Sequence, residues 1–191
     1  MVEIRRLIAE LAVSETVKEK VLAVYQSIAE AESKVHGAEV DQIHFHEVGS
    51  MDAVADVVGV CLLMERLAPE RVVVSPVSTG FGQVRCAHGI LPVPAPATAL
   101  LLRGVPCRPG NVEGELCTPT GAALLTHFAD EFGPAPTMAA EKIGYGMGNK
   151  DFEAANCVRA LLGETAGGGD EVAELCCNLD DMTAEALGFA Q

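Results

Sequence analysis

Apolar residues recur at three- and four-residue steps through the first 34 residues, and this spacing constrains the fold more than any other feature. The pattern covers Val2 to about Leu11 and then Glu15 to Lys34. Residues spaced in this way lie on one side of a helix, and Ser14 is well placed to cap the second helix. The sequence therefore predicts a helical hairpin at the start of the fold.

Extended and helical segments then follow each other without a regular alternation. Ile43 to Val48 reads as a short extended segment, Ser50 can cap a helix that runs to about Leu67, and Arg71 to Val77 reads as a buried strand. Ser78 to Gly104 contains four glycines and three prolines, which predicts a loop or hairpin followed by a helix starting near Pro96.

The second half of the chain continues this mixture. Another extended piece begins at Cys107, and Thr118 to Gly133 has the ends of a capped helix, with proline at its first position and glycine after its end. Thr137 to Gly163 predicts two paired strands around a glycine-rich turn, Gly144 to Asp151. The expected fold class is therefore α+β, with mixed α/β layers, an N-terminal helical hairpin and a mixed sheet with packed helices.

Glycines 167 to 169 have the composition of a flexible linker. A strand is expected from Glu171 to Asn178, and a helix begins at Thr183. We therefore expect one domain over residues 1–166, with residues 167–191 forming the linker and the start of a following strand-helix region.

The charge of the chain restricts its partners. Its 27 acidic and 13 basic residues give a net charge of -14, which would repel a phosphate backbone or an anionic membrane and attract a divalent cation. No nucleic acid or membrane partner is expected. The N-terminus lacks the features of a signal peptide, so a cytoplasmic location is expected. The seven cysteines are odd in number and scattered, which favours reduced core cysteines over disulfides.

A metal site is the first chemical hypothesis. His44 and His46 lie on one face of an extended segment, because side chains alternate along a strand. Glu47, Asp52 and a loop histidine, His88, are the further candidate ligands. Imidazoles with carboxylates suit zinc, nickel or iron. The alternative is that the histidines are hydrogen-bonded structural residues and that the carboxylates cap the helix or face solvent.

A phosphate site is the second hypothesis. The helix start CTPTGA offers unpaired backbone N–H groups, the hydroxyls of Thr118 and Thr120, and Gly121, where a ligand can approach the backbone closely. Gly144 and Gly146 can form a similar backbone nest. Ordinary helix capping explains the first feature equally well. Asp180 and Asp181 form a second carboxylate pair, suited to a hard cation or to a helix cap. No catalytic residue is assigned.

Five blocks carry a resemblance to a known family. They are HFHEVGSMDAVADVVG (44–59), SPVSTGFGQVRCAHGILPVPAPAT (75–98), GELCTPTGAALL (114–125), IGYGMGNKD (143–151) and NLDDMTAEALG (178–188). Together and in this order they resemble the LarC family, the nickel insertion proteins for pyridinium-3,5-bisthiocarboxylic acid mononucleotide. Members usually open with a strand and a glycine-rich segment and continue beyond the last block, so the chain is expected to be truncated at both ends.

The resemblance implies a CTP-dependent nickel insertase, a cyclometallase of the lyase or chelatase class, in the intact protein. Its expected ligands are Ni(II), the pyridinium mononucleotide, and CTP with a divalent cation. An enzyme that receives the nickel-pincer cofactor and a homo-oligomeric state are further possibilities. The alternative is a non-catalytic metal-binding or scaffold domain that assembles oligomers and presents a metal.

Overall fold

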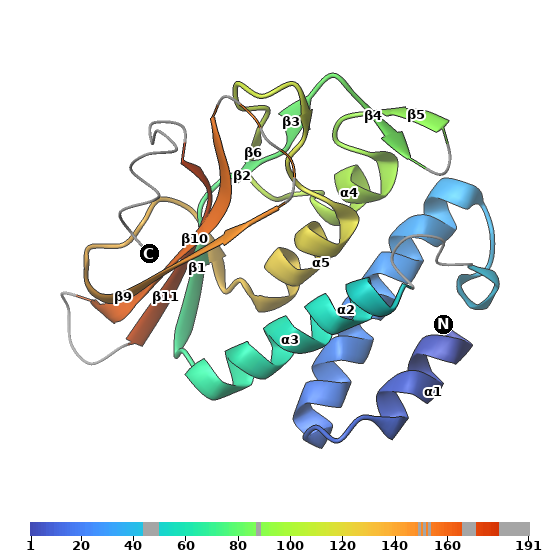
Figure 1. The fold of residues 1–191 in the computed structure, drawn as a ribbon, viewed down its shortest axis with the longest axis horizontal. Helices are drawn as coiled ribbons and strands as arrows, with labels where there is room; N and C mark the ends of the chain where they lie inside the picture. Colours follow the sequence, from blue (N-terminus) through green and yellow to red (C-terminus); the bar gives the residue numbers. More distant parts are fainter. Residues whose placement is uncertain are drawn as a thin grey trace.

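The computed structural model describes residues 1–43, 50–86, 89–148, 150, 152, 154–165 and 171–179, the last of these and Gln42 by their backbone alone. Helices and a mixed sheet are both present, which confirms the predicted α+β class. The helices gather on one side of the five-stranded sheet (Figure 1). Within the described residues, no helix is long and apolar enough to cross a membrane.

The predicted N-terminal hairpin is confirmed as helices α1 (Val2–Glu10) and α2 (Glu15–His36). The Ser14 hydroxyl accepts a hydrogen bond from the Val17 N–H at 3.1 Å, as expected of a helix cap. A left-handed Gly37 ends α2. A short 3-10 helix, Val40–Gln42, then leads to Ile43.

Helix α3 (Met51–Leu67) begins at the predicted cap, where the Ser50 hydroxyl accepts from the Ala53 N–H at 3.3 Å. It buries Val54, Val57 and Cys61 on one side. The helix ends at Ala68, which adopts a left-handed conformation with φ of 43°.

The five-stranded sheet has the order β8-β1-β11-β10-β9. Strand β1 (Arg71–Val74) is parallel to β8 (Glu131–Phe132) and to β11 (Glu171–Leu179). Strand β10 (Ala155–Thr165) is antiparallel to both β11 and β9 (Met138–Met147), so the predicted pair of strands is confirmed. Strand β11 lies between β1 and β10. The domain division at residue 166 stays a prediction, because residues 166–170 and 180–191 lie outside the described residues.

Three predicted boundaries were wrong. The first four residues of the predicted glycine-rich turn, Gly144 to Met147, are part of β9, because they pair with β10. The helix after Thr118 ends at Phe128 instead of near Gly133, since Glu131 and Phe132 form β8 alongside β1. The strand expected from Arg71 to Val77 is divided into β1 and β2, which belong to different sheets.

Three two-stranded sheets and two helices fill the middle of the chain. The sheets pair β2 (Val77–Ser78) with β6 (Cys107–Arg108), β3 (Gly80–Phe81) with β7 (Gly114–Glu115), and β4 (Gln83–Cys86) with β5 (Gly89–Pro92). The helices are α4 (Pro96–Leu101) and α5 (Pro119–Phe128). The predicted hairpin and the helix start at Pro96 are thus confirmed. The β4–β5 hairpin lies away from the five-stranded sheet (Figure 1).

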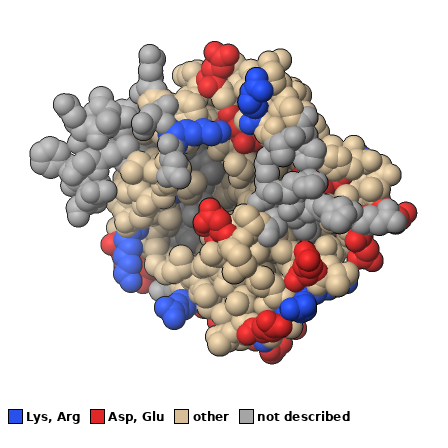
Figure 2. Space-filling view, turned by 45° about the vertical axis from the view of Figure 1, so that its right-hand side comes forward, with Lys and Arg blue, Asp and Glu red and all other residues tan. Residues whose placement is uncertain are grey.

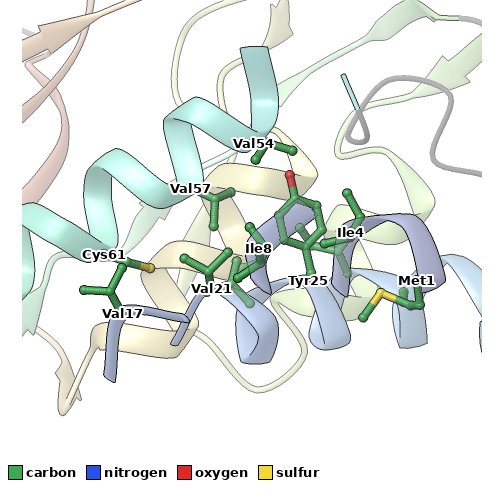
Figure 3. Packing of buried hydrophobic residues seen from close by; sticks show 13 residues of the cluster. Met1, Ile4, Ile8, Val17, Val21, Tyr25, Val54, Val57 and Cys61 are labelled. Atoms are coloured by element: carbon green, nitrogen blue, oxygen red, sulfur yellow. The ribbon is translucent and has the colours of Figure 1, made fainter. Parts of the chain in front are cut away.

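Helix α5 lies between two hydrophobic clusters. Its Ala122 and Leu125 pack in a cluster with the valines of β1 and β2, and its Ala123 packs with α1, α2 and α3. Figure 3 shows the second cluster, where side chains of α1, α2 and α3 meet. Burial on opposite sides therefore fixes α5 in the middle of the molecule and holds its N-terminus in place.

A candidate phosphate site and a candidate metal segment

The N-terminus of α5 is built as a capped helix start. Thr118 is extended, and its hydroxyl accepts from the Gly121 N–H at 3.2 Å. Pro119 occupies the first turn, where a missing N–H is tolerated. The capping role of Thr118 is thus confirmed, and the phosphate role of Thr118, Thr120 and Gly121 stays a prediction. A Cβ added at Gly121 would lie 3.5 Å from the Thr118 hydroxyl oxygen, which is an ordinary contact.

The glycine-rich segment STGFG lies directly beside the segment that leads into α5. Gly80 pairs with Glu115, and the Leu116 N–H donates to the Thr79 carbonyl at 3.1 Å. Gly80 has φ of 79°, and an added Cβ would lie 1.8 Å from the Gly114 carbonyl oxygen. Only glycine fits there. The segment STGFG and the segment that leads into α5 are therefore neighbours in the fold, although they lie more than 30 residues apart in the sequence.

Phe152 brings a third part of the chain to the same place. It follows β9 in the sequence, and its ring lies 3.3 Å from the position of a Cβ added at Gly114. Gly144 and Gly146 themselves lie in the extended strand β9, opposite Ala160 and Val158. These two glycines therefore belong to a strand instead of a turn, and their role in binding a phosphate stays a prediction.

A cation lies within this network. The Arg108 Nε donates to the Ser78 hydroxyl at 3.0 Å, and the Thr79 N–H donates to the Arg108 carbonyl at 2.9 Å. The backbone contacts of Thr79 thus connect Arg108 to Leu116, two residues before Thr118. The side chains of Ser78 and Thr79 are buried, whereas Arg108 is exposed. The guanidinium group of Arg108 is thus held on a segment that pairs with the chain leading into α5, and a guanidinium is suited to an anion.

Most residues of the predicted metal site lie outside the part of the chain that the structure describes. His44, His46, Glu47, His88, Asp180 and Asp181 lie outside the described residues. Asp52 lies in the first turn of α3, exposed, two residues after the Ser50 cap. In the part of the chain that is described, no three side chains of His, Cys, Asp or Glu are grouped to hold a metal. The metal hypothesis therefore stays a prediction.

Tyr25 lies beneath the same end of α3. Its side chain is fully buried, and Figure 3 shows its hydroxyl directed toward Val54. Burial, followed by the negative charge of Asp56, raises the pKa of Tyr25 to about 12. The hydroxyl therefore stays protonated at neutral pH, next to the helix that follows the predicted metal segment.

The pKa values of three described thiols are raised and that of His127 is lowered. Burial raises the pKa of Cys61 to about 11 and raises those of Cys107 and Cys157, so these groups are thiols at neutral pH. Burial, and then the charge of Lys20, lowers the pKa of His127. Of the cysteines whose side chains are described, Cys61, Cys117 and Cys157 are buried, Cys86 is half-buried and Cys107 is exposed.

Comparison with known proteins establishes the family. The profile of the nickel insertion protein family matches residues 1–191. The chain belongs to this family. It is 45% identical to a pyridinium-3,5-bisthiocarboxylic acid mononucleotide nickel insertion protein of Desulfitobacterium hafniense (strain DSM 10664 / DCB-2), over 98% of this chain and 48% of that protein. No solved structure matches the chain.

Two further relatives are also named as nickel insertion proteins. One, from Staphylococcus saprophyticus, bears the same name and is 43% identical over 98% of this chain and 48% of its own length. A putative nickel insertion protein of Geotalea daltonii is 47% identical over 98% of this chain and 49% of its own length. The chain thus spans about half the length of the curated relatives it matches.

Sequence reasoning about this nickel insertion family member missed two candidate residues, Arg108 and Tyr25. Arg108 lies ten residues before Thr118, and only the β2–β6 pairing brings it to Ser78. The feature that could have indicated Arg108 in the sequence is a basic residue in an extended segment of a strongly acidic chain. Tyr25 occupies a core position of α2. The helical spacing of the apolar residues around it predicts that it is buried, but does not predict which groups its hydroxyl faces.

Proposed function

We propose that this chain is part of a protein that inserts nickel into pyridinium-3,5-bisthiocarboxylic acid mononucleotide to form the nickel-pincer cofactor. The observation that carries the proposal is the family match over all 191 residues. Two relatives named for this reaction are 45% and 43% identical to this chain over 98% of its length.

The mononucleotide phosphate would bind at the start of α5. Pro119 has no N–H, and the Gly121 N–H is bonded to the Thr118 hydroxyl. The Thr120 N–H and hydroxyl would therefore contact the phosphate at the helix start, where a negative charge is stabilised, and Gly121 would allow its close approach. Arg108, held by the Ser78 hydroxyl, would supply the cation. On the face in Figure 2, basic and acidic side chains are interspersed, so a small anion held by defined groups suits the molecule better than a polyanion.

Ni(II) would be bound as a substrate by His44, His46 and Glu47, with Asp52 and His88 as further ligands. Imidazole nitrogens with carboxylate oxygens suit this borderline ion. Forming the bond from nickel to the ring carbon replaces a carbon–hydrogen bond and releases one proton. A neutral imidazole or a carboxylate beside the ring can accept this proton.

CTP with a divalent cation would drive the reaction in the intact protein. Asp180 and Asp181 are our proposed carboxylate ligands for a hard cation, since such ions prefer oxygen donors. The product would pass to the enzyme that uses the nickel-pincer cofactor. We place the reaction in the cytoplasm.

The proposal is tested by measuring cofactor formation when this chain forms part of a full-length protein. A chimera would carry this chain in place of the segment it matches in the Desulfitobacterium hafniense relative. It would be incubated with Ni(II), the pyridinium mononucleotide, CTP and Mg²⁺, and nickel bound to the small-molecule product would be measured by mass spectrometry. We expect product from the chimera. A folded chimera that yields none, beside an active unaltered relative, would refute the proposal.

Arg108→Gln tests the phosphate site within that assay. Loss of the guanidinium should raise the KM for the mononucleotide about tenfold or more with a smaller effect on kcat, because a charge-assisted hydrogen bond contributes about 1.5–3 kcal/mol. Arg103→Gln, which removes another exposed arginine, is the matched control. Equal KM values for the two variants would refute a role for Arg108.

A non-catalytic metal-binding or scaffold domain is the second candidate. It predicts nickel binding to the chain and no turnover in the chimera.

A further inference from the structure

Helix α3 carries an apolar ridge on the side away from its own core. Its buried residues, Val54, Val57 and Cys61, face the α1–α2 hairpin. At 3.6 residues per turn, residues at four-residue steps form a ridge along the other side. Met51, Leu63 and Leu67 on this ridge have exposed fractions of 70%, 57% and 44%. The ridge consists of Met51, Ala55, Gly59, Leu63 and Leu67.

Gly59 lies at the middle of this ridge. A Cβ added there would meet no atom within 4 Å, so packing within the chain does not require a glycine. Glycine inside a helix is less stable than alanine by about 0.5–1 kcal/mol. The absence of a side chain at the centre of an exposed apolar ridge allows another backbone to approach closely. In Figure 1, α3 crosses in front of α2 with no described helix or strand in front of it.

The ridge is complementary to itself. If two copies of α3 lie antiparallel about Gly59, Met51 of one copy faces Leu67 of the other, and Ala55 faces Leu63. The same arrangement brings Asp52 to Arg66 of the second copy, and the twofold axis repeats this pair. Both side chains are exposed in the single chain.

We propose that two copies of this chain form a twofold-symmetric dimer through antiparallel α3 helices that cross at Gly59. A twofold dimer uses the same surface on both copies, which this ridge permits. Each copy has a net charge of -14, so association needs local opposite charges at the contact. The two Asp52–Arg66 pairs supply them. This inference goes beyond the proposed reaction and does not depend on it; the Asp52–Arg66 pair is proposed for the metal-free chain, and nickel binding by Asp52 would compete with this pair.

Sedimentation equilibrium of the 191-residue chain in EDTA tests the dimer without a contribution from nickel. A concentration series from about 1 µM to about 1 mM covers the range expected of a small interface. Gly59→Gln introduces a good helix former that blocks the approach. Ala23→Gln, on the exposed side of α2, is its matched control. Circular dichroism confirms that each variant folds.

Charge reversal tests the register. Asp52→Arg or Arg66→Asp alone places like charges together twice, and the double variant restores opposite charges. We expect the wild-type chain and Ala23→Gln to dimerise. Gly59→Gln and each single reversal should raise the dissociation constant at least about tenfold, and the double reversal should recover most of this loss.

Three results would overturn the proposal. They are a wild-type chain that stays monomeric throughout the series, a Gly59→Gln chain that dimerises as the wild type does, and a double reversal no better than the single ones. A monomeric chain would indicate that the ridge is covered by another segment of a longer protein or by another partner.

Discussion

At the scale of single residues, glycine positions separate structural from functional roles. Gly80 has no room for a side chain, because the Gly114 carbonyl oxygen occupies the space. Gly121 does have room for a methyl group, so packing does not explain its presence. A ligand that approaches the backbone of the α5 N-terminus would explain it.

This contrast gives a paired prediction. Gly80→Ala should lower the free energy of unfolding by about 2–4 kcal/mol, through steric overlap and an unfavourable positive φ. Gly121→Ala should leave it unchanged or raise it by up to about 1 kcal/mol, because alanine favours the helix. Urea denaturation measures both, and equal effects of the two variants would contradict the geometry.

Tyr25 makes stability depend on alkaline pH. Its pKa is raised to about 12 in the folded protein, and an unfolded tyrosine titrates near 10. The folded state therefore holds its proton more tightly. This stabilisation is fully present below about pH 10 and is lost as the pH rises through about 12. Two pKa steps correspond to about 2–3 kcal/mol.

The Tyr25→Phe variant isolates this contribution. Unfolding free energies of both proteins would be measured from pH 9 to about pH 12. We expect the wild type to lose about 2–3 kcal/mol more than the variant over this interval. Parallel curves would show that Tyr25 ionises in the folded protein as it does in the unfolded one.

At the scale of elements, the helix starts were predictable and several ends were not. Ser14, Ser50 and Thr118 each cap a helix, because a hydroxyl before an apolar pattern is a local signal. The end of α5 depends on β1. That strand pairs with Glu131 and Phe132 and so draws them out of the helix pattern. Pairing between distant segments leaves no local signal.

The end of α3 gives a prediction at this scale. Ala68 is left-handed, which is unfavourable for a residue with a Cβ. Ala68→Gly should therefore raise the free energy of unfolding by about 0.5–1 kcal/mol. Ala23→Gly in the interior of α2 should lower it by about 1 kcal/mol. Thermal melts measure both changes, and a loss of stability in Ala68→Gly would contradict the assigned helix end.

At the scale of the whole molecule, the sequence predicted the α+β class, the helical hairpin and the paired strands, because these follow from periodicity and turn residues. It did not predict which segments meet. The contact of STGFG with the segment that leads into α5, and the pairing of Arg108 with Ser78, follow from strand pairs whose members lie about 30 residues apart in the sequence. Five motif blocks, taken together, did identify the family that the comparisons establish.

The central claim, that this chain handles nickel through His44 and His46, is tested most directly by nickel stoichiometry. Equilibrium dialysis with Ni(II) would compare the wild-type chain with the double variant His44→Ala and His46→Ala, and His36→Ala and His127→Ala would serve as the matched control. We predict that the wild type and the control bind about one ion per chain and that the double variant loses it while keeping its fold. Unchanged nickel binding in the double variant, together with lowered stability, would contradict the claim and make these histidines structural.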